Sequence, residues 1–230
     1  MIHPVTDAGA LARLYTEILE PSFPPSELVT RDEFAEGAVA GVLDVLAASD
    51  GDSYLGAVVG QRYGGAFLVD WLAVGGARRG GGTGAALVAA GVARWLARPG
   101  VHVVLAEIER PDMFATHAHY GDPARRLAFY ERQGATLLDL PYYQPAIDEG
   151  LARVRNLLLI VLAASNPAPP PRVLDPDETA AVRAVLLGTM GPPDPGDPET
   201  ADVYAAVDNP SGLRLLPLSD YARVPLLDGR

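Results

Sequence analysis

The spacing of apolar residues predicts helices near the start of the chain. Apolar side chains recur every three or four positions between residues 8 and 19, which is typical of one buried helix face, and Thr6 or Asp7 can cap its first turn. A second helix is expected over residues 31–40, capped by Thr30. We expect the loop between these helices to be stiffened by its prolines.

Apolar runs of strand length then follow one another. Two short turns, 49–52 and Gly64–Gly65, separate the first runs and favour antiparallel hairpins. A predicted helix over residues 85–97 separates two later runs and implies a parallel pair with a right-handed crossover. The expected fold is α/β (α+β), a mixed, mostly antiparallel central sheet flanked by helices. Its predicted strands are residues 1–5, 42–48, 53–63, 66–74, 101–109, 136–140 and 153–163.

The chain after residue 164 contains more proline and no further predicted strand. Residues 165–171 form a proline-rich segment that predicts a stiff linker. Two further helices are expected, over residues 177–187 and around 200–207. We therefore predict one domain over residues 1–165 and a C-terminal extension over residues 166–230.

Composition excludes several kinds of chemistry. The sequence has no cysteine, and all 18 of its basic side chains are arginine, so thiolate metal sites, cysteine nucleophiles and lysine Schiff bases are ruled out. The net charge of −11 argues against a broad nucleic-acid surface. The longest apolar run, over residues 157–164, is too short to span a membrane, and the start of the chain lacks a signal-peptide pattern. A cytoplasmic protein is the expectation.

The most informative stretch is a glycine-rich turn over residues 75–84 that precedes a helix. Converging N–H groups and the positive end of a helix dipole make such a turn suited to phosphate groups. Arg78 and Arg79 could add side-chain donors. A P-loop is excluded because it needs a lysine. Gly80, Gly82 and Ala85 also fit a dinucleotide-binding pattern, and Glu107 follows at about the expected distance. The antiparallel hairpins predicted before this turn argue against the βαβ unit that such a site needs.

Two motifs resemble those of a known family. A strand with Leu72 and Val74 precedes Arg79-x-x-Gly82-x-Gly84, and the segment 129–135 reads Phe-Tyr-Glu-Arg-Gln-Gly-Ala. Together they resemble the acetyl-coenzyme A signature and the later tyrosine segment of the GNAT N-acetyltransferase superfamily. The resemblance covers roughly residues 1–165. It implies the GNAT fold, acetyl-coenzyme A (acetyl-CoA) as co-substrate and an amine as acceptor.

The resemblance also implies which residues meet the coenzyme. The strand end is expected to pair with the pantetheine arm, one of its N–H groups to polarise the thioester, and the turn to bind the pyrophosphate. The expected contacts are Leu72, Ala73, Val74, Arg79, Gly80, Gly81, Gly82, Thr83, Gly84 and Ala85. Arg126 stands where the family often has a small or amide residue, and it could bind a phosphate instead. No metal is expected, because His117 and His119 lack a third ligand nearby.

Acetyl transfer also needs an acid and a base. Tyr130 matches the family's tyrosine that protonates the leaving thiolate. The candidate bases are Glu107, Asp70 and Glu109, in that order, because a carboxylate among apolar neighbours has a raised pKa. For each of them a solvated or salt-bridged carboxylate is an equal alternative. The absence of cysteine favours direct attack in a ternary complex over a covalent acetyl-enzyme.

Two alternatives to this enzyme stay open at this point. One is a non-catalytic coenzyme A-binding sensor or scaffold, and the other is a dinucleotide-dependent oxidoreductase. The acceptor of the leading hypothesis is a small-molecule or peptide amine, with pocket walls expected around residues 20–35, 110–122 and 141–150. Phe23 and Glu27 could meet it, although loop packing and a solvated charge are the simpler interpretations. No nucleic-acid or membrane partner is expected, and a homodimer is compatible with the sequence.

Overall fold

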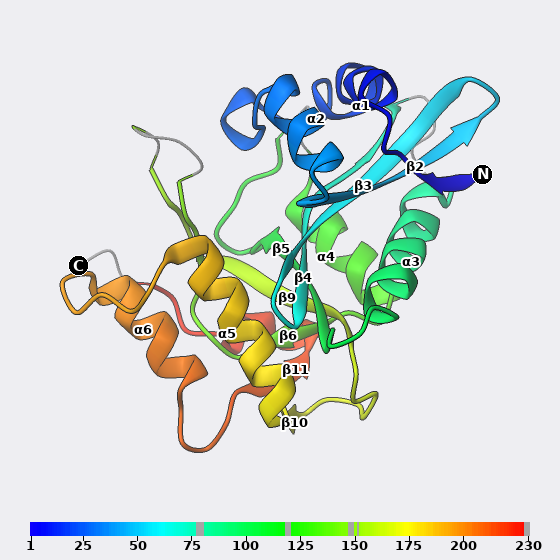
Figure 1. Cartoon of the computed structure of the whole chain (residues 1–230). Coiled ribbons are helices and arrows are strands. Elements are labelled where there is room, and N and C mark those ends of the chain that lie inside the picture. Colours follow the sequence, from blue (N-terminus) through cyan, green and yellow to red (C-terminus); the bar gives the residue numbers. More distant parts are fainter. Residues whose placement is uncertain (77–80, 118–120, 147–149, 151, 228–230) are drawn as a thin grey trace. The chain divides into compact units, whose positions relative to one another are not determined.

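A computed structural model describes residues 1–76, 81–117, 121–146, 150 and 152–227 of the chain (Figure 1). The expected coenzyme contacts Arg79 and Gly80, and also Arg78, lie outside the described residues. The chain divides into two compact units. The first comprises Met1–Arg62 and Leu68–Ala97, and the second comprises Tyr63–Phe67 and Arg98–Arg230.

Most of the first unit precedes the glycine-rich turn, and one long helix follows it. Its elements are β1 (Ile2–Pro4), α1 (Ala8–Leu14), a π-helical turn η1 (Tyr15–Leu19), a 3₁₀ turn η2 (Pro25–Glu27), α2 (Arg31–Val39), β2 (Leu43–Asp50), β3 (Ser53–Tyr63), β4 (Ala66–Val74) and α3 (Thr83–Leu96).

The first two helices begin where the sequence predicts. The Asp7 side chain caps α1 by accepting a hydrogen bond from the Ala10 amide. Thr30 and Glu33 form a reciprocal capping box at the start of α2. The single helix predicted over residues 8–19 is instead α1 followed by a π-helical turn, a feature that is frequent at functional sites.

The strands of this unit lie in the order β1, β2, β3, β4, and β2 pairs antiparallel with both β1 and β3. The turn between β2 and β3 is tighter than predicted, because β2 continues to Asp50 and only Gly51 and Asp52 remain between the strands. Gly51 has a φ of 57°, the left-handed conformation that such a turn requires. Trp95 of α3 is fully buried, and its ring lies where a side chain at Gly60 or Gly91 would stand.

The second unit holds the remaining elements. They are β5 (Val103–Glu109), α4 (Pro123–Arg132), β6 (Thr136–Leu138), β7 (Tyr143–Gln144), β8 (Val154–Arg155), β9 (Leu157–Ala164), β10 (Arg172–Val173), α5 (Pro176–Met190), α6 (Pro198–Val207), β11 (Arg214–Pro217) and a 3₁₀ turn η4 (Leu218–Arg223).

Its strands run in the order β5, β9, β6, β11, β10, and every pair is antiparallel. The strand predicted over residues 153–163 is divided at Asn156, which has a φ of 61° and separates β8 from β9. The short β8 then pairs with β7 in a separate two-stranded sheet. Strands β10 and β11, which the sequence did not predict, carry the main sheet on into the C-terminal extension.

Buried charges fix the extension within this unit. Glu178 of α5 is fully buried and pairs with Arg172 at 2.6 Å. Arg110, only 3% exposed, pairs with Asp112 and donates hydrogen bonds to the carbonyl oxygens of Ala222 and Val224. The expected fold class is confirmed: a mostly antiparallel sheet flanked by helices. The predicted boundary at residues 165 and 166 stays a prediction.

Candidate active site

The end of the glycine-rich turn leads directly into the start of α3. Gly82 is the N-cap residue, with a φ of 81° that favours glycine, and it has no side chain to cap the helix. Thr83, Gly84 and Ala85 form the first turn, whose N–H groups have no partner further back in the helix. A side chain added at Gly82 would stand in open space. This helix start therefore presents backbone donors to solvent, an arrangement that fits an anionic group.

The end of β4 is held closely against β3. The Gly75 amide donates to the Leu55 carbonyl at 2.9 Å. A side chain at Gly56 of β3 would lie 2.5 Å from the Ala73 carbonyl oxygen, so only glycine permits this approach. Ala73 is buried, whereas Leu72 and Val74 are partly exposed. The strand end expected to meet the coenzyme is thus fixed in place within its own unit.

The loop between the two N-terminal helices packs against the core of the first unit. Phe23 packs against the core of the first unit, and the indole N–H of Trp71 donates to the Glu27 carbonyl at 2.8 Å. A cavity of about 440 Å³ lies nearby, lined by Tyr15, Thr16, Glu20, Thr30, Arg31 and Asp32. Asp70 lies on β4 of this unit with its side chain partly buried.

Glu107 of β5 is the carboxylate with the most distinctive surroundings. Its Oε1 accepts a hydrogen bond from the Tyr142 hydroxyl, and its Oε2 accepts one from the Gln144 side-chain amide at 2.9 Å. Burial raises the pKa of Glu107 above its ordinary value, while the two hydrogen bonds favour the ionised form and partly offset that rise. The carboxylate is therefore oriented by two donors and has a raised proton affinity.

Tyr130 lies in the middle of α4 and is 5% exposed. Burial raises the pKa of its hydroxyl to about 12, although the nearby positive charge of Arg126 lowers it somewhat. Its ring meets Phe129 edge to face at 4.9 Å. The hydroxyl is consequently protonated throughout the physiological pH range.

Arg126 and Glu109 pair with each other, at 2.9 Å between Nη1 and Oε2. This contact ties α4 to β5, the strand that carries Glu107. It also gives Glu109 the salt-bridged role that was the alternative to a base, and it engages the arginine that the sequence offered as a phosphate ligand.

The sequence placed Tyr142 and Gln144 only within the pocket wall expected around residues 141–150, and did not link them to Glu107. The signal that could have found them is their spacing, because residues two apart in an extended segment share a face; Tyr142 directly precedes β7 and Gln144 lies in it. His117 is exposed, and His119 lies outside the described residues. Among the described residues, no three histidine or acidic side chains are placed to hold a metal ion. None of the described helices has the length and hydrophobicity needed to cross a membrane.

Comparison with known proteins gives a consistent result at the level of structure. No family model and no curated protein sequence matches the chain. A solved structure from Bacteroides thetaiotaomicron, assigned to the GNAT family of acetyltransferases, matches with a TM-score of 0.61 and 25% identity over 84% of this chain and 99% of that one.

Two further solved structures share the fold at lower identity. YncA from Salmonella typhimurium, described as an acetyltransferase and solved with acetyl-CoA, has a TM-score of 0.51 and 17% identity, covering 74% of this chain and 96% of that one. The ribosomal-protein-S18-alanine N-acetyltransferase from Escherichia coli has a TM-score of 0.50 and 16% identity, covering 73% and 96%. These two likenesses concern the fold alone. With the two sequence motifs, the likeness to the Bacteroides structure places the chain in the GNAT superfamily of acyltransferases.

Proposed function

We propose that this protein transfers an acetyl group from acetyl-CoA to an amine by direct attack in a ternary complex. The observation that carries the proposal is Glu107, a carboxylate with a raised pKa that is oriented by two side-chain donors. The same chain contains a glycine-rich turn that leads into α3, a helix without a side-chain cap. One feature suits proton removal and the other suits a coenzyme phosphate.

The backbone of the first unit would hold the coenzyme. The N–H groups of Thr83, Gly84 and Ala85 would bind the pyrophosphate, with the Thr83 hydroxyl as a further donor. The edge of β4 at Leu72–Val74 would pair with the amide groups of the pantetheine arm. A backbone N–H at this strand end would polarise the thioester carbonyl.

Side chains of the second unit would move the protons. As the amine nitrogen bonds to the thioester carbon and the carbon–sulfur bond breaks, Glu107 accepts the proton that the nitrogen loses, directly or through water. Asp70, on β4 of the first unit, is the second candidate for this role. A thiol has a pKa of roughly 8.5, so complete proton transfer from a phenol whose pKa is about 12 is unfavourable. Tyr130 would therefore stabilise the leaving thiolate mainly by donating a hydrogen bond.

The acceptor is proposed at the level of its chemistry, a small-molecule or peptide amine. The Escherichia coli neighbour acts on a protein alanine by its name, which shows only that this fold accommodates such an acceptor. The cavity between η1 and the start of α2 is lined by Glu20, Asp32 and Arg31, and Arg31 pairs with Asp32 at 3.6 Å. The charge of Glu20 suits an ammonium group before it loses its proton.

The test begins with calorimetric titration of the purified chain with acetyl-CoA, NAD and ATP. Micromolar binding of acetyl-CoA alone would support the proposal, and acetyl transfer would then be followed by thiol release against a panel of amines. Binding of acetyl-CoA without turnover on any amine would instead favour the coenzyme-sensing alternative. Binding of NAD in place of acetyl-CoA would overturn both.

A further inference from the structure

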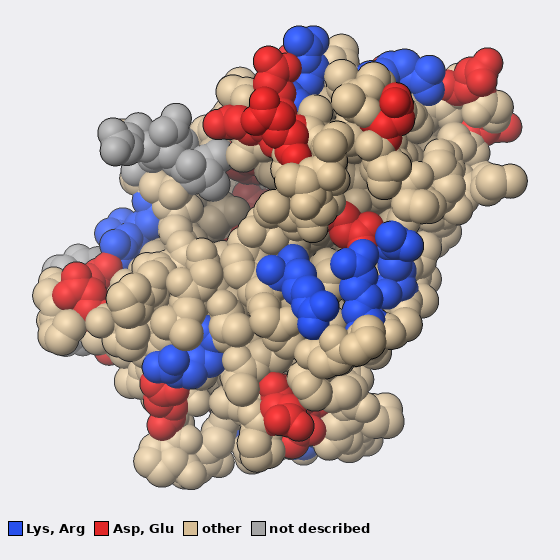
Figure 2. All heavy atoms as spheres, viewed as in Figure 1, with Lys and Arg blue, Asp and Glu red and all other residues tan. Residues whose placement is uncertain are grey.

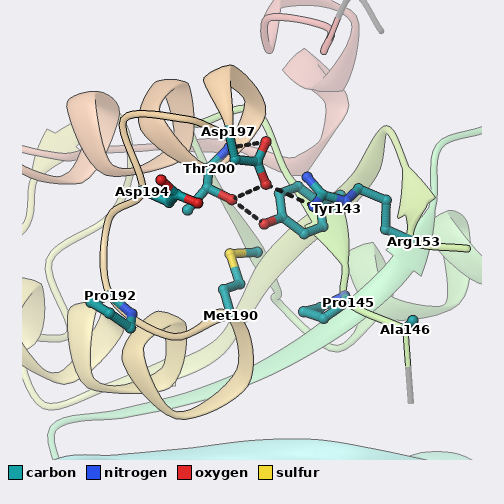
Figure 3. Close-up of a pocket in the computed structure, with 9 residues that line it drawn as sticks. All are labelled: Tyr143, Pro145, Ala146, Arg153, Met190, Pro192, Asp194, Asp197 and Thr200. Atoms are coloured by element: carbon teal, nitrogen blue, oxygen red, sulfur yellow. Dashed lines mark hydrogen bonds and ion pairs between the residues drawn. The ribbon is translucent and has the colours of Figure 1, made fainter. Parts of the chain in front are cut away.

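A second cavity lies wholly within the second unit, away from the glycine-rich turn in sequence. Its volume is about 300 Å³, at the lower end of the range for small-molecule sites. Three segments contribute to it: β7 with the residues just after it, Arg153, and the connection between α5 and α6 (Figure 3). The last of these belongs to the C-terminal extension, whose role the sequence left open.

One wall of this cavity is polar and firmly built. Asp197, the N-cap residue of α6, accepts hydrogen bonds from the Thr200 hydroxyl at 2.8 Å and from the Thr200 and Glu199 amides. The Thr200 hydroxyl also shares a hydrogen bond with the Tyr143 hydroxyl at 2.5 Å. Thr200 and Tyr143 are each only 3% exposed. This wall is therefore ordered by its own contacts.

The charges at the wall favour a cation. Arg153 is the one basic side chain among the described residues that line the cavity. Its two terminal nitrogens form ion pairs with Asp197 at 2.7 Å and with Glu199 at 3.1 Å. The pairing with Arg153 lowers the pKa of Asp197 to about 2, so this carboxylate is ionised at neutral pH. Asp194 adds a second carboxylate, whose Oδ1 accepts a hydrogen bond from the Gly196 amide at 2.8 Å. An anion would meet two carboxylates and an arginine already engaged by acids.

The other side of the cavity is apolar. Figure 3 shows Met190, Pro192 and Pro145 across from the group formed by Asp194, Asp197 and Thr200. A methionine side chain adapts readily to ligands of different shape. The lining thus combines hydrogen-bond acceptors and net negative charge on one side with hydrocarbon surface on the other.

We propose that this cavity binds a small organic ammonium ion. The ammonium group lies against the Asp194 carboxylate and the hydroxyls of Thr200 and Tyr143, and the hydrocarbon body lies on Met190 and Pro145. The site uses none of the residues assigned to the coenzyme or to the proton transfers, although three of its lining residues fall within the segment 141–150 that the sequence assigned to a wall of the acceptor pocket. It gives the C-terminal extension a binding role.

The test is calorimetric titration of the full chain with three probes that share one phenylethyl body. These are 2-phenylethylammonium, uncharged 2-phenylethanol and anionic 3-phenylpropionate. We expect the ammonium to bind best and the carboxylate worst, with a difference of at least about tenfold in Kd, since a charge-assisted hydrogen bond contributes roughly that much.

Two variants locate the site. Asp194→Asn is expected to weaken binding of the ammonium about tenfold and to leave the alcohol nearly unchanged. Ala146→Trp, at an exposed lining position, is expected to weaken the ammonium and the alcohol alike by filling the cavity. Asp202→Asn, an exposed acid of α6 that does not line the cavity, is the matched control.

Equal affinity for the ammonium and the carboxylate would overturn the proposal, as would ammonium binding unaffected by both cavity variants. Absence of binding at millimolar concentrations in the folded protein would do the same. None of these results depends on turnover, so a chain without acetyltransferase activity could still confirm the ammonium site, and an active enzyme could still lack it.

Discussion

The two units offer different kinds of functional group. In the first, the candidate contacts are mainly backbone amides at the start of α3 and at the end of β4, in a setting of glycine and alanine. In the second, they are side chains, and several are linked to one another: Glu107 to Tyr142 and Gln144, and Tyr143 to Thr200. The proposed coenzyme site therefore depends on chain conformation, and the proposed chemistry depends on residue identity.

The difference shows in how each site tolerates substitution. A backbone N–H donor can be removed from a site only by changing the chain conformation, and only a few glycine positions determine that conformation. Removing a side-chain donor or acceptor needs a single conservative replacement. Figure 2 shows acidic and basic side chains occurring together over the viewed face.

The largest expected effect is on the side-chain site. Glu107→Gln keeps the shape of the side chain and removes its basic form, so kcat for acetyl transfer should fall about 10²- to 10⁴-fold while acetyl-CoA still binds. Steady-state kinetics and calorimetry measure the two parts. Glu131→Gln, an exposed acid of α4, is the matched control. Turnover within twofold of the unmodified chain would transfer the role of base to Asp70 or to water.

The next effect tests the backbone site. Gly82→Asp places a carboxylate and a strained residue at the start of α3, and we expect acetyl-CoA affinity to fall at least about 100-fold through charge repulsion and altered N–H directions. Gly134→Asp is a close control, because Gly134 has nearly the same φ, 80° against 81°, and equally open space. Equal loss of binding in both variants would show that backbone strain alone is responsible.

A smaller effect concerns pH. The hydrogen bond from Tyr142 lowers the pKa of Glu107 against the effect of burial, so Tyr142→Phe should raise that pKa further. Because the ionised form is the base, the acidic limb of the profile of kcat against pH should move to higher pH. Gln144→Leu should move it in the same direction. An unchanged limb in both variants would separate Glu107 from the titration that controls turnover.

The smallest effect concerns the link between α4 and β5. The Arg126–Glu109 pair is about one-third exposed, so Arg126→Gln should lower the free energy of unfolding by only about 0.5 kcal/mol, measured by urea denaturation. Acetyl-CoA affinity should stay within twofold, because the structure engages this arginine with Glu109. A loss of affinity of tenfold or more would return Arg126 to the coenzyme site.

Local signals made much of the fold predictable. Asp7, Thr30 and Asp122 cap their helices through contacts within three residues, and such contacts can be read directly from sequence. The division at Asn156 was missed because an apolar run gives no sign of a left-handed residue beside it. Strands β10 and β11 were missed because they are short and are paired only through residues far away in sequence.

The candidate sites show the same contrast between contacts that are local in sequence and contacts that are distant. The glycine-rich turn is contiguous, so its motif alone is enough to predict an anion site. The contacts of Glu107 span 35 and 37 positions, and that of Tyr143 with Thr200 spans 57. No local pattern encodes such pairs, since tertiary packing alone brings them together. The pairing of residues 66–74 with 101–109 stays a prediction.

Strand β7 has a practical consequence for protein engineering. Its side chains alternate in direction. Gln144 donates a hydrogen bond to Glu107, whereas Tyr143, one residue earlier, shares a hydrogen bond with Thr200 of α6. A hybrid that joins residues 1–165 of this chain to a foreign tail would separate Tyr143 from its partner without altering any residue of the proposed transfer site. Recombination between related chains should therefore exchange residues 107–227 as one block, because this keeps Glu107 with Tyr142 and Gln144. A library divided at the linker would break the contact between Tyr143 and Thr200.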